Sequence, residues 1–88
     1  MPQIQKELIV KNPQGLHARP AALFVQIVSK YNSAVTITCG GEKINGRSIM
    51  GLLTLGLQRG TRVVVDINGD DAEDVMSELQ KLLSQEGI

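Results

Sequence analysis

The sequence is poor in the residues on which several kinds of small protein depend. Its 88 residues include one cysteine, Cys39, and no tryptophan, with a single tyrosine and a single phenylalanine. A lone cysteine can form neither an internal disulfide nor a cysteine-rich metal cluster, which excludes a disulfide framework. Because aromatic side chains are so few, the core has to be built from aliphatic residues and methionine, as in ordinary small α/β domains.

The chain also lacks an excess of charge of either sign, a long apolar run and an apolar leader. Nine lysines and arginines balance nine aspartates and glutamates, so the basic surface that nucleic acids and acidic membranes attract is missing. No apolar run reaches the length of about 20 residues that crosses a bilayer, and the first residues do not have the pattern of a signal peptide. We therefore expect a cytoplasmic protein of one domain, residues 1–88, that neither binds nucleic acid nor inserts into membranes.

The apolar periodicity predicts seven elements in the order β-α-β-β-α-β-α. The predicted strands cover about residues 3–10, 35–39, 42–45 and 62–67, and the predicted helices about 18–30, 49–55 and 71–85. Ser48 is placed to cap the second helix, and Asp70 with Glu73 has the spacing of a capping box before the third. Since each helix has one apolar face and each strand one polar face, we expect an α+β fold with all helices on one side of a single sheet.

The only histidine, His17, lies where the loop at residues 12–15 meets the first predicted helix. Backbone N–H groups in a first helical turn lack helical partners and the helix dipole is positive there, so a phosphoryl group on His17 would be stabilised. Arg19 adds a guanidinium suited to phosphate oxygens, and Pro20 removes no helical hydrogen bond in a first turn. A neutral imidazole is a nucleophile near pH 7. These residues fit either a phosphoryl acceptor or an ordinary polar residue at a helix start.

The short helix at residues 49–55 carries apolar residues on two sides, and a helix of this length cannot easily bury both. One side consists of Ile49, Leu52 and Leu55. The neighbouring arc of the helix and its exit consists of Met50, Leu53 and Leu57. From the pattern alone, Leu53 and Leu57 either extend the core or form with Met50 an exposed patch that docks a partner.

The remaining polar groups have structural explanations. The acidic residues around the start of the last helix are typical of a cap and a first turn, and no histidine accompanies them as a metal ligand: Asp70, Asp71, Glu73 and Asp74. Cys39 alternates into the core, where a thiol is inert. Residues 46–51 lack the basic surroundings of an RNA-clamping glycine loop. The sequence therefore predicts neither a metal site nor a cofactor.

Two separated segments resemble one known family. The segment Gly15-Leu16-His17-Ala18-Arg19-Pro20-Ala21 is similar to the active-site segment of HPr, the histidine-containing phosphocarrier protein of the bacterial phosphoenolpyruvate-dependent sugar phosphotransferase system. The segment Ser48-Ile49-Met50-Gly51-Leu52-Leu53-Thr54-Leu55-Gly56 resembles a second part of that family, at the same interval from His17. The resemblance extends to the chain length and the element order. It implies an open-faced sandwich in which three helices cover one side of four antiparallel strands.

The resemblance implies a phosphorylation site at His17. The phosphoryl group would be carried on Nδ1, Arg19 would assist its transfer, and Ala18 would lend a backbone amide to the phosphate. The expected activity is that of a carrier rather than of a stand-alone enzyme. His17 would receive the phosphoryl group from phosphorylated enzyme I, itself charged from phosphoenolpyruvate, and deliver it to enzyme IIA domains.

The resemblance also implies regulation at Ser48, which from its position alone is a helix cap. In many bacteria a dedicated kinase, HPr kinase/phosphorylase, phosphorylates the corresponding serine with ATP. A dianion at Ser48 would place negative charge beside Met50 and Leu53, for which the resemblance favours partner docking, and would alter partner choice.

Three other functions remain open at this point. The first is a mainly regulatory module that binds a transcriptional regulator when Ser48 is phosphorylated, although His17 argues against regulation as the only role because related regulatory proteins can lack the histidine. The second is a phosphocarrier of the nitrogen-related branch, to which the segment Ser48-Ile49-Met50-Gly51 is less similar than to the sugar branch. The third is a small acyl- or phospho-hydrolase of similar topology, which would turn over a low-molecular-weight substrate.

Overall fold

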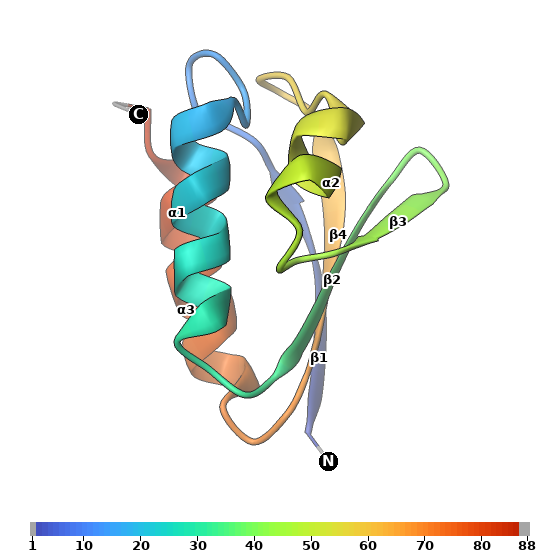
Figure 1. Cartoon of the computed structure of the whole chain (residues 1–88), viewed down its shortest axis with the longest axis vertical. Helices are drawn as coiled ribbons and strands as arrows, with labels where there is room; N and C mark the ends of the chain where they lie inside the picture. Colours follow the sequence, from blue (N-terminus) through green and yellow to red (C-terminus); the bar gives the residue numbers. More distant parts are fainter. Residues whose placement is uncertain (1, 87–88) are drawn as a thin grey trace.

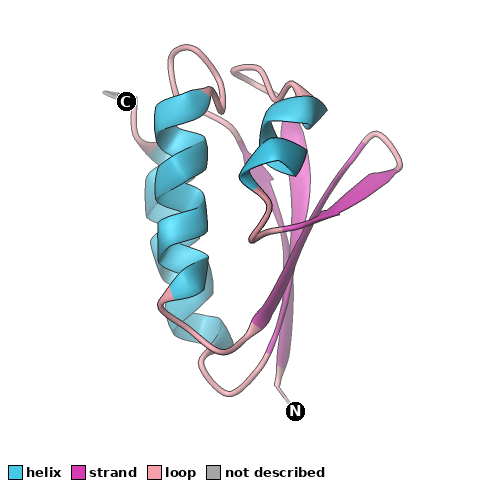
Figure 2. Ribbon diagram, in the orientation of Figure 1, coloured by secondary structure: helices cyan, strands magenta, loops and turns pink. Residues whose placement is uncertain are grey.

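The structure, a computed structural model, describes residues 2–86 and contains the seven elements in the predicted order (Figures 1 and 2). The strands are β1 (Gln3–Ile9), β2 (Ala34–Cys39), β3 (Glu42–Asn45) and β4 (Arg62–Asn68). The helices are α1 (Ala18–Ser29), α2 (Ile49–Leu55) and α3 (Ala72–Ser84). No boundary differs from its predicted position by more than one residue. No helix in this part of the chain combines the length and the hydropathy that a bilayer crossing requires.

The four strands form one antiparallel sheet in the order β1-β4-β2-β3. β4 lies between β1 and β2, so that Val65 has Lys6 as its partner on one side and Ile37 on the other. All three helices lie on the same side of this sheet and leave its other side uncovered (Figures 1 and 2). The predicted fold, an open sheet with three helices on one face, is confirmed.

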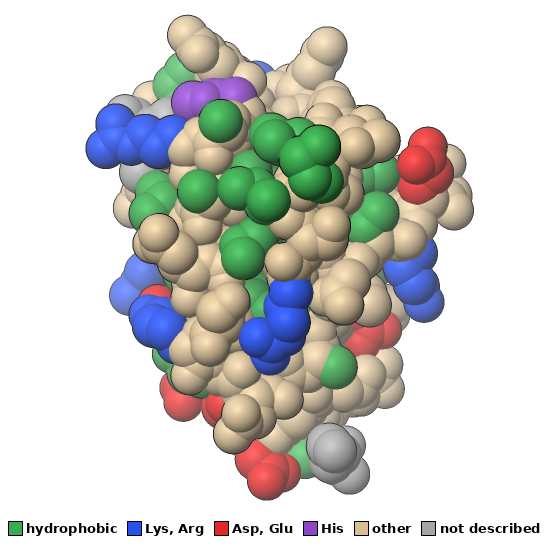
Figure 3. Space-filling model, viewed as in Figure 1, with side chains coloured by type: hydrophobic (Ala, Val, Ile, Leu, Met, Phe, Trp, Pro, Cys, Tyr) green, Lys and Arg blue, Asp and Glu red, His purple; other side chains and the backbone are tan. Residues whose placement is uncertain are grey.

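The core fills the space between the sheet and the helices. β4 turns Val63, Val65 and Ile67 into it, as strand alternation predicts. The helices contribute buried residues from one face each, among them Phe24, Val28, Leu52, Val75, Leu79 and Leu83. Hydrophobic side chains also remain at the surface, where they gather over the upper part of α1 and α2 (Figure 3).

The start of α3 differs from the capping box predicted with Asp70 and Glu73. The N-cap residue is Asp71, and its side chain makes no capping hydrogen bond. Its carboxylate instead accepts hydrogen bonds from the Ser33 hydroxyl and, at 3.3 Å, from the backbone N–H of Asn32. The hydrogen bond from Ser33 is the main reason that the pKa of Asp71 is lowered. The capping-box prediction is therefore wrong, because the carboxylate at this helix start holds the loop between α1 and β2.

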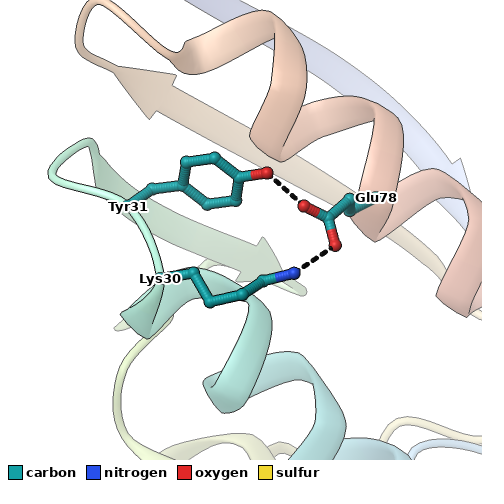
Figure 4. A network of polar contacts seen from close by, with 3 residues as sticks. All are labelled: Lys30, Tyr31 and Glu78. Atoms are coloured by element: carbon teal, nitrogen blue, oxygen red, sulfur yellow. Dashed lines mark hydrogen bonds and ion pairs between the residues drawn. The ribbon is translucent and has the colours of Figure 1, made fainter.

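A second polar contact fastens the C-terminal end of α1 to α3 (Figure 4). The Glu78 carboxylate accepts a hydrogen bond from the Tyr31 hydroxyl and pairs with Lys30, with 2.7 Å between Nζ and Oε1. The hydrogen bonds from Lys30 and Tyr31 lower the pKa of Glu78. In turn, the hydrogen bond to Glu78 is the main reason that the pKa of Tyr31 rises to about 12.

The Tyr31 hydroxyl is accordingly expected to titrate with a midpoint of about 12. Because this pKa is raised above the unfolded value of about 10, the contact stabilises the fold fully below pH 10 and loses its effect as the pH rises toward 12. Phenolate absorbance reports this group alone, since the chain has one tyrosine and no tryptophan. Circular dichroism at each pH checks that the chain is folded.

The matched variant is Glu78→Gln, which removes the negative charge beside the hydroxyl. Its tyrosine midpoint should fall toward the ordinary value. The same midpoint in both proteins would contradict the assignment of the shift to Glu78.

Candidate functional site

His17 is the N-cap residue of α1. The N-terminal end of α1 is the upper end of this helix in Figure 1. The backbone of His17 is extended, with φ −78° and ψ −167°, and its carbonyl oxygen accepts a hydrogen bond of 2.9 Å from the N–H of Ala21. Its half-buried side chain makes no capping hydrogen bond. The backbone of His17 therefore starts the helix, while the imidazole is not used for capping.

The start of α1 offers hydrogen-bond donors and positive charge close to His17. Ala18 and Arg19 are the first two helical residues, and the N–H groups of these positions have no carbonyl partner within a helix. Pro20 follows as a buried residue without an N–H. Arg19 is exposed and forms no ion pair with any residue from 2 to 86. Since the first turn holds no acidic residue, nothing there opposes the helix dipole in stabilising an anion.

The loop before His17 is anchored on α3 through Asn12. The Asn12 side chain is fully buried, and its Nδ2 donates to the carbonyl oxygens of Leu82, at 2.9 Å, and Gln85, at 3.0 Å. The Asn12 carbonyl accepts the N–H of Gly15 at 2.9 Å, which closes a tight turn. The end of α3 and the approach to His17 are thus joined by one side chain.

The segment that follows α2 packs against the same loop. The N–H of Leu16 donates to the carbonyl oxygen of Leu57 at 2.7 Å. Gly15 has a φ of +71°, and a Cβ on it would collide with the Leu57 carbonyl oxygen and lie 2.8 Å from Cα of Gln58. Only glycine permits this approach, so the position of His17 depends on both α3 and the exit from α2.

Three side chains of α2 form an exposed apolar patch on the face that α1 and α2 share. These residues, the α2 patch, are Met50, Ile49 and Leu53, with exposed fractions of 69, 38 and 37%. In Figure 3 the hydrophobic side chains of this face lie directly below the histidine. On a helical wheel Ile49 falls on the same side of the helix as Leu52, which is buried in the core. A wheel gives an angle around the helix but not where the core ends along it, and Ile49 is the first residue of α2.

Leu57 does not belong to this surface. It is 3% exposed and is part of the core. The chain leaves the helix at Gly56, which is in the left-handed region with φ +62°, so the arc drawn through Met50 and Leu53 does not continue to Leu57. The expectation of a docking role for Leu57 is therefore wrong, and the alternative, that it extends the core, holds.

Ser48 is the N-cap residue of α2, as predicted. Its Oγ accepts a hydrogen bond of 3.0 Å from the backbone N–H of Gly51. The side chain is half-buried and directly precedes the α2 patch in the chain. The hydroxyl hydrogen can still be replaced, because in this contact the oxygen is the acceptor.

Cys39 is a free thiol at the end of β2, partly buried against the core. Within residues 2–86 no three histidine, cysteine, aspartate or glutamate side chains come together as ligands of a metal ion.

Comparison with known proteins gives a consistent family. A family model described as the PTS HPr component phosphorylation site matches residues 4–85. The phosphocarrier protein HPr from Bacillus anthracis str. Ames is 34% identical over 94% of this chain and 99% of its own, with a TM-score of 0.89. HPr-C-His from Thermoanaerobacter tengcongensis is 41% identical over 94% of this chain and 91% of its own, with a TM-score of 0.83. Crh, the catabolite repression protein of Bacillus subtilis, is 36% identical over 97% and 98%, with a TM-score of 0.74.

Proposed function

Because this chain belongs to the HPr family, the phosphocarriers of the bacterial phosphotransferase system, we propose that it relays phosphoryl groups through His17. In this proposal His17 accepts the group from phosphorylated enzyme I, which phosphoenolpyruvate charges, and passes it to enzyme IIA domains. One observation carries the proposal: the imidazole of His17 is not used for capping and stands at a helix start that offers free N–H groups and Arg19.

The chemistry asks for a nucleophile and for donors around the moving phosphoryl group. As the bond from phosphorus to Nδ1 of His17 forms, the bond from phosphorus to enzyme I breaks, and charge spreads over the three equatorial oxygens. The N–H of Ala18 and the guanidinium of Arg19, which follow His17 in the first turn of α1, can stabilise this charge. The same donors serve the reverse step, in which phosphoimidazole gives the group to enzyme IIA. The chain is then a carrier and needs no cofactor.

The decisive experiment mixes the purified chain with enzyme I and phosphoenolpyruvate. A phosphorylated chain is expected whose adduct is labile in acid and stable in alkali, as phosphohistidine is, and mass spectrometry of its peptides should locate the phosphate on His17. Adding an enzyme IIA domain should remove the label. A chain that stays unmodified, or an adduct that survives acid, would refute the relay.

The α2 patch is proposed as the surface that docks these partners. We expect the double variant Met50→Ala with Leu53→Ala to raise the KM of enzyme I for the chain by roughly thirtyfold at unchanged kcat, since two truncated contact side chains of about 1 kcal/mol each weaken binding without touching His17. Steady-state phosphorylation of the variant measures both constants. The matched control is Ile9→Ala, because Ile9 is also exposed, at 42%, but lies on β1. An equal rise in KM for the control would contradict docking at the patch.

A second role, regulation at Ser48, is favoured by the likeness to the catabolite repression protein Crh. In this proposal HPr kinase/phosphorylase transfers the ATP phosphoryl group to Ser48 Oγ, and the phosphorylated chain binds a transcriptional regulator. A phosphate at a helix N-terminus is electrostatically favourable, so α2 should persist while the charge beside the α2 patch changes partner choice. Incubation with the kinase and ATP, with Ser48→Ala as control, tests this role. An unmodified wild-type chain would count against it.

The proposal further assigns the chain, as one HPr-like domain of residues 1–88, to the sugar branch and to the cytoplasm. The segment Ser48-Ile49-Met50-Gly51 supports the sugar branch, and a lone cysteine fits a reducing compartment. The phosphorylated chain should therefore transfer its label faster to an enzyme IIA of the sugar branch than to one of the nitrogen-related branch. The opposite preference would move the assignment to the nitrogen branch.

A further inference from the structure

Asn12 is a fully buried polar residue that the proposed transfer step does not use. Its Nδ2 donates to the carbonyl oxygens of Leu82 and Gln85, and its Oδ1 has no hydrogen-bond partner among the described residues. Buried polar side chains are normally satisfied completely, so a half-satisfied one calls for an explanation. The amide nitrogen is the part of the Asn12 side chain that makes hydrogen bonds in this fold.

The two carbonyls that Asn12 binds lie at the C-terminal end of α3, where the last carbonyls lack i+4 partners within the helix. The Leu82 carbonyl also accepts the N–H of the C-cap residue Gln85, at 3.3 Å. An apolar side chain at position 12 would leave no unpaired oxygen of its own, but it would leave both carbonyls without this donor. The neighbouring N–H of Lys11 also donates to α3, at 2.8 Å from the carbonyl oxygen of Leu83. Asn12 therefore ties the beginning of the His17 loop to the end of α3.

At the other end of the same loop, the His17 side chain makes no hydrogen bond that would fix the start of α1. The Asn12 carbonyl accepts the N–H of Gly15, and the next residue, Leu16, is bound to Leu57. The His17 side chain makes no capping hydrogen bond, so the place of His17 at the start of α1 depends on the backbone between Asn12 and His17. Small displacements of a reacting atom are costly, because transfer needs the reacting groups aligned at close range.

We infer that Asn12 is a positioning residue for phosphoryl transfer: through its amide it fixes the turn that aims the imidazole of His17 along the start of α1. This inference rests on the proposed relay through His17. Asn12 acts on the reaction only through the backbone of the turn, so it should affect the transfer step and leave the docking of partners on the α2 patch unchanged.

The test compares full-length Asn12→Ala with the wild-type chain in phosphorylation by enzyme I and phosphoenolpyruvate. We expect kcat to fall on the order of tenfold because the imidazole is misaligned, with KM changed by less than about twofold because the α2 patch is intact. The NMR signals of the His17 ring should also move in the variant. The matched control is Glu78→Gln, which weakens the attachment of α3 to the opposite end of α1 and should keep the wild-type kcat and His17 signals.

Each outcome decides between the proposals. If the wild-type chain takes up no phosphate on His17, the relay fails and this inference falls with it. If the wild-type chain is phosphorylated and folded Asn12→Ala keeps its kcat, or if Glu78→Gln loses as much, only the positioning role is overturned. Should Asn12→Ala not fold, Asn12→Ser, whose hydroxyl can still donate to one carbonyl, takes its place, and a reduced kcat supports the inference while a wild-type kcat overturns it.

Discussion

Replacement of His17 by alanine is expected to abolish phosphorylation by enzyme I and phosphoenolpyruvate. The chain has no second histidine, so no other side chain can form a phosphoimidazole. A phosphate ester on a serine or threonine hydroxyl would give its phosphoryl group away far more slowly. The loss should therefore be complete rather than partial, whatever the concentration of enzyme I. Acid-labile incorporation of phosphate, followed in parallel for both proteins, measures it.

The same substitution is expected to change the free energy of unfolding by no more than about 0.5 kcal/mol, as at other partly exposed positions without special contacts. The imidazole makes no capping hydrogen bond, and the contact between the His17 carbonyl and Ala21 belongs to the backbone, which alanine retains. Urea unfolding of both proteins checks this. Arg19→Ala serves as the matched variant, since it removes a donor and should slow the transfer without preventing it. An acid-labile adduct in His17→Ala would show that another residue accepts the group.

Replacement of Gly15 by alanine is expected to lower the free energy of unfolding by about 3 kcal/mol or more. Part of this loss comes from the φ of +71°, which costs a residue with a Cβ about 1 to 2 kcal/mol. The remainder comes from the collision with the backbone at Leu57 and Gln58, which cannot be relieved by rotating a side chain. The loop would have to move away from the exit of α2, so phosphorylation of His17 should slow as well.

The control for Gly15 is Gly56→Ala. Gly56 has a similar φ of +62°, but a Cβ on it would meet nothing within 4 Å. Its replacement should cost only the conformational part, about 1 to 2 kcal/mol. Urea or thermal unfolding of the three proteins gives both values. Equal losses in the two variants would show that the close approach at Gly15 contributes nothing.

The sequence predicts the elements well because their signals are local. Alternation of apolar residues gives the strands, the helical spacing of apolar residues gives α1 and α3, and the hydroxyl of Ser48 at a loop end gives the cap of α2. Errors arise where a distant segment competes for a residue. The Asp71 carboxylate accepts hydrogen bonds from Ser33 and Asn32 and does not cap its own helix. Leu57 follows Gly56, where the helix ends, and is buried in the core.

The candidate site divides in the same way. His17, Arg19 and Pro20 could be assigned to a helix start from their order alone, but their chemistry fits an ordinary cap equally well. The resemblance of two segments decided in favour of the family, which the family model over residues 4–85 shows. The role of Asn12 has no local signal, since its partners Leu82 and Gln85 lie at the other end of the chain. Only the composition of the turn, Asn-Pro-Gln-Gly, marks this loop as ordered.

The small size of the α2 patch favours short-lived complexes in the proposed relay. A surface of three apolar side chains beside one reactive ring belongs to the class of small, transient interfaces, which release their partners quickly. In the proposed relay, enzyme I and enzyme IIA both need the imidazole of His17, so they bind the same face in turn and form no ternary complex. The chain has no net charge to steer its partners at long range. Adding more enzyme IIA should therefore drain the phosphorylated pool and, because it occupies the face that enzyme I also needs, slow the reloading of the chain.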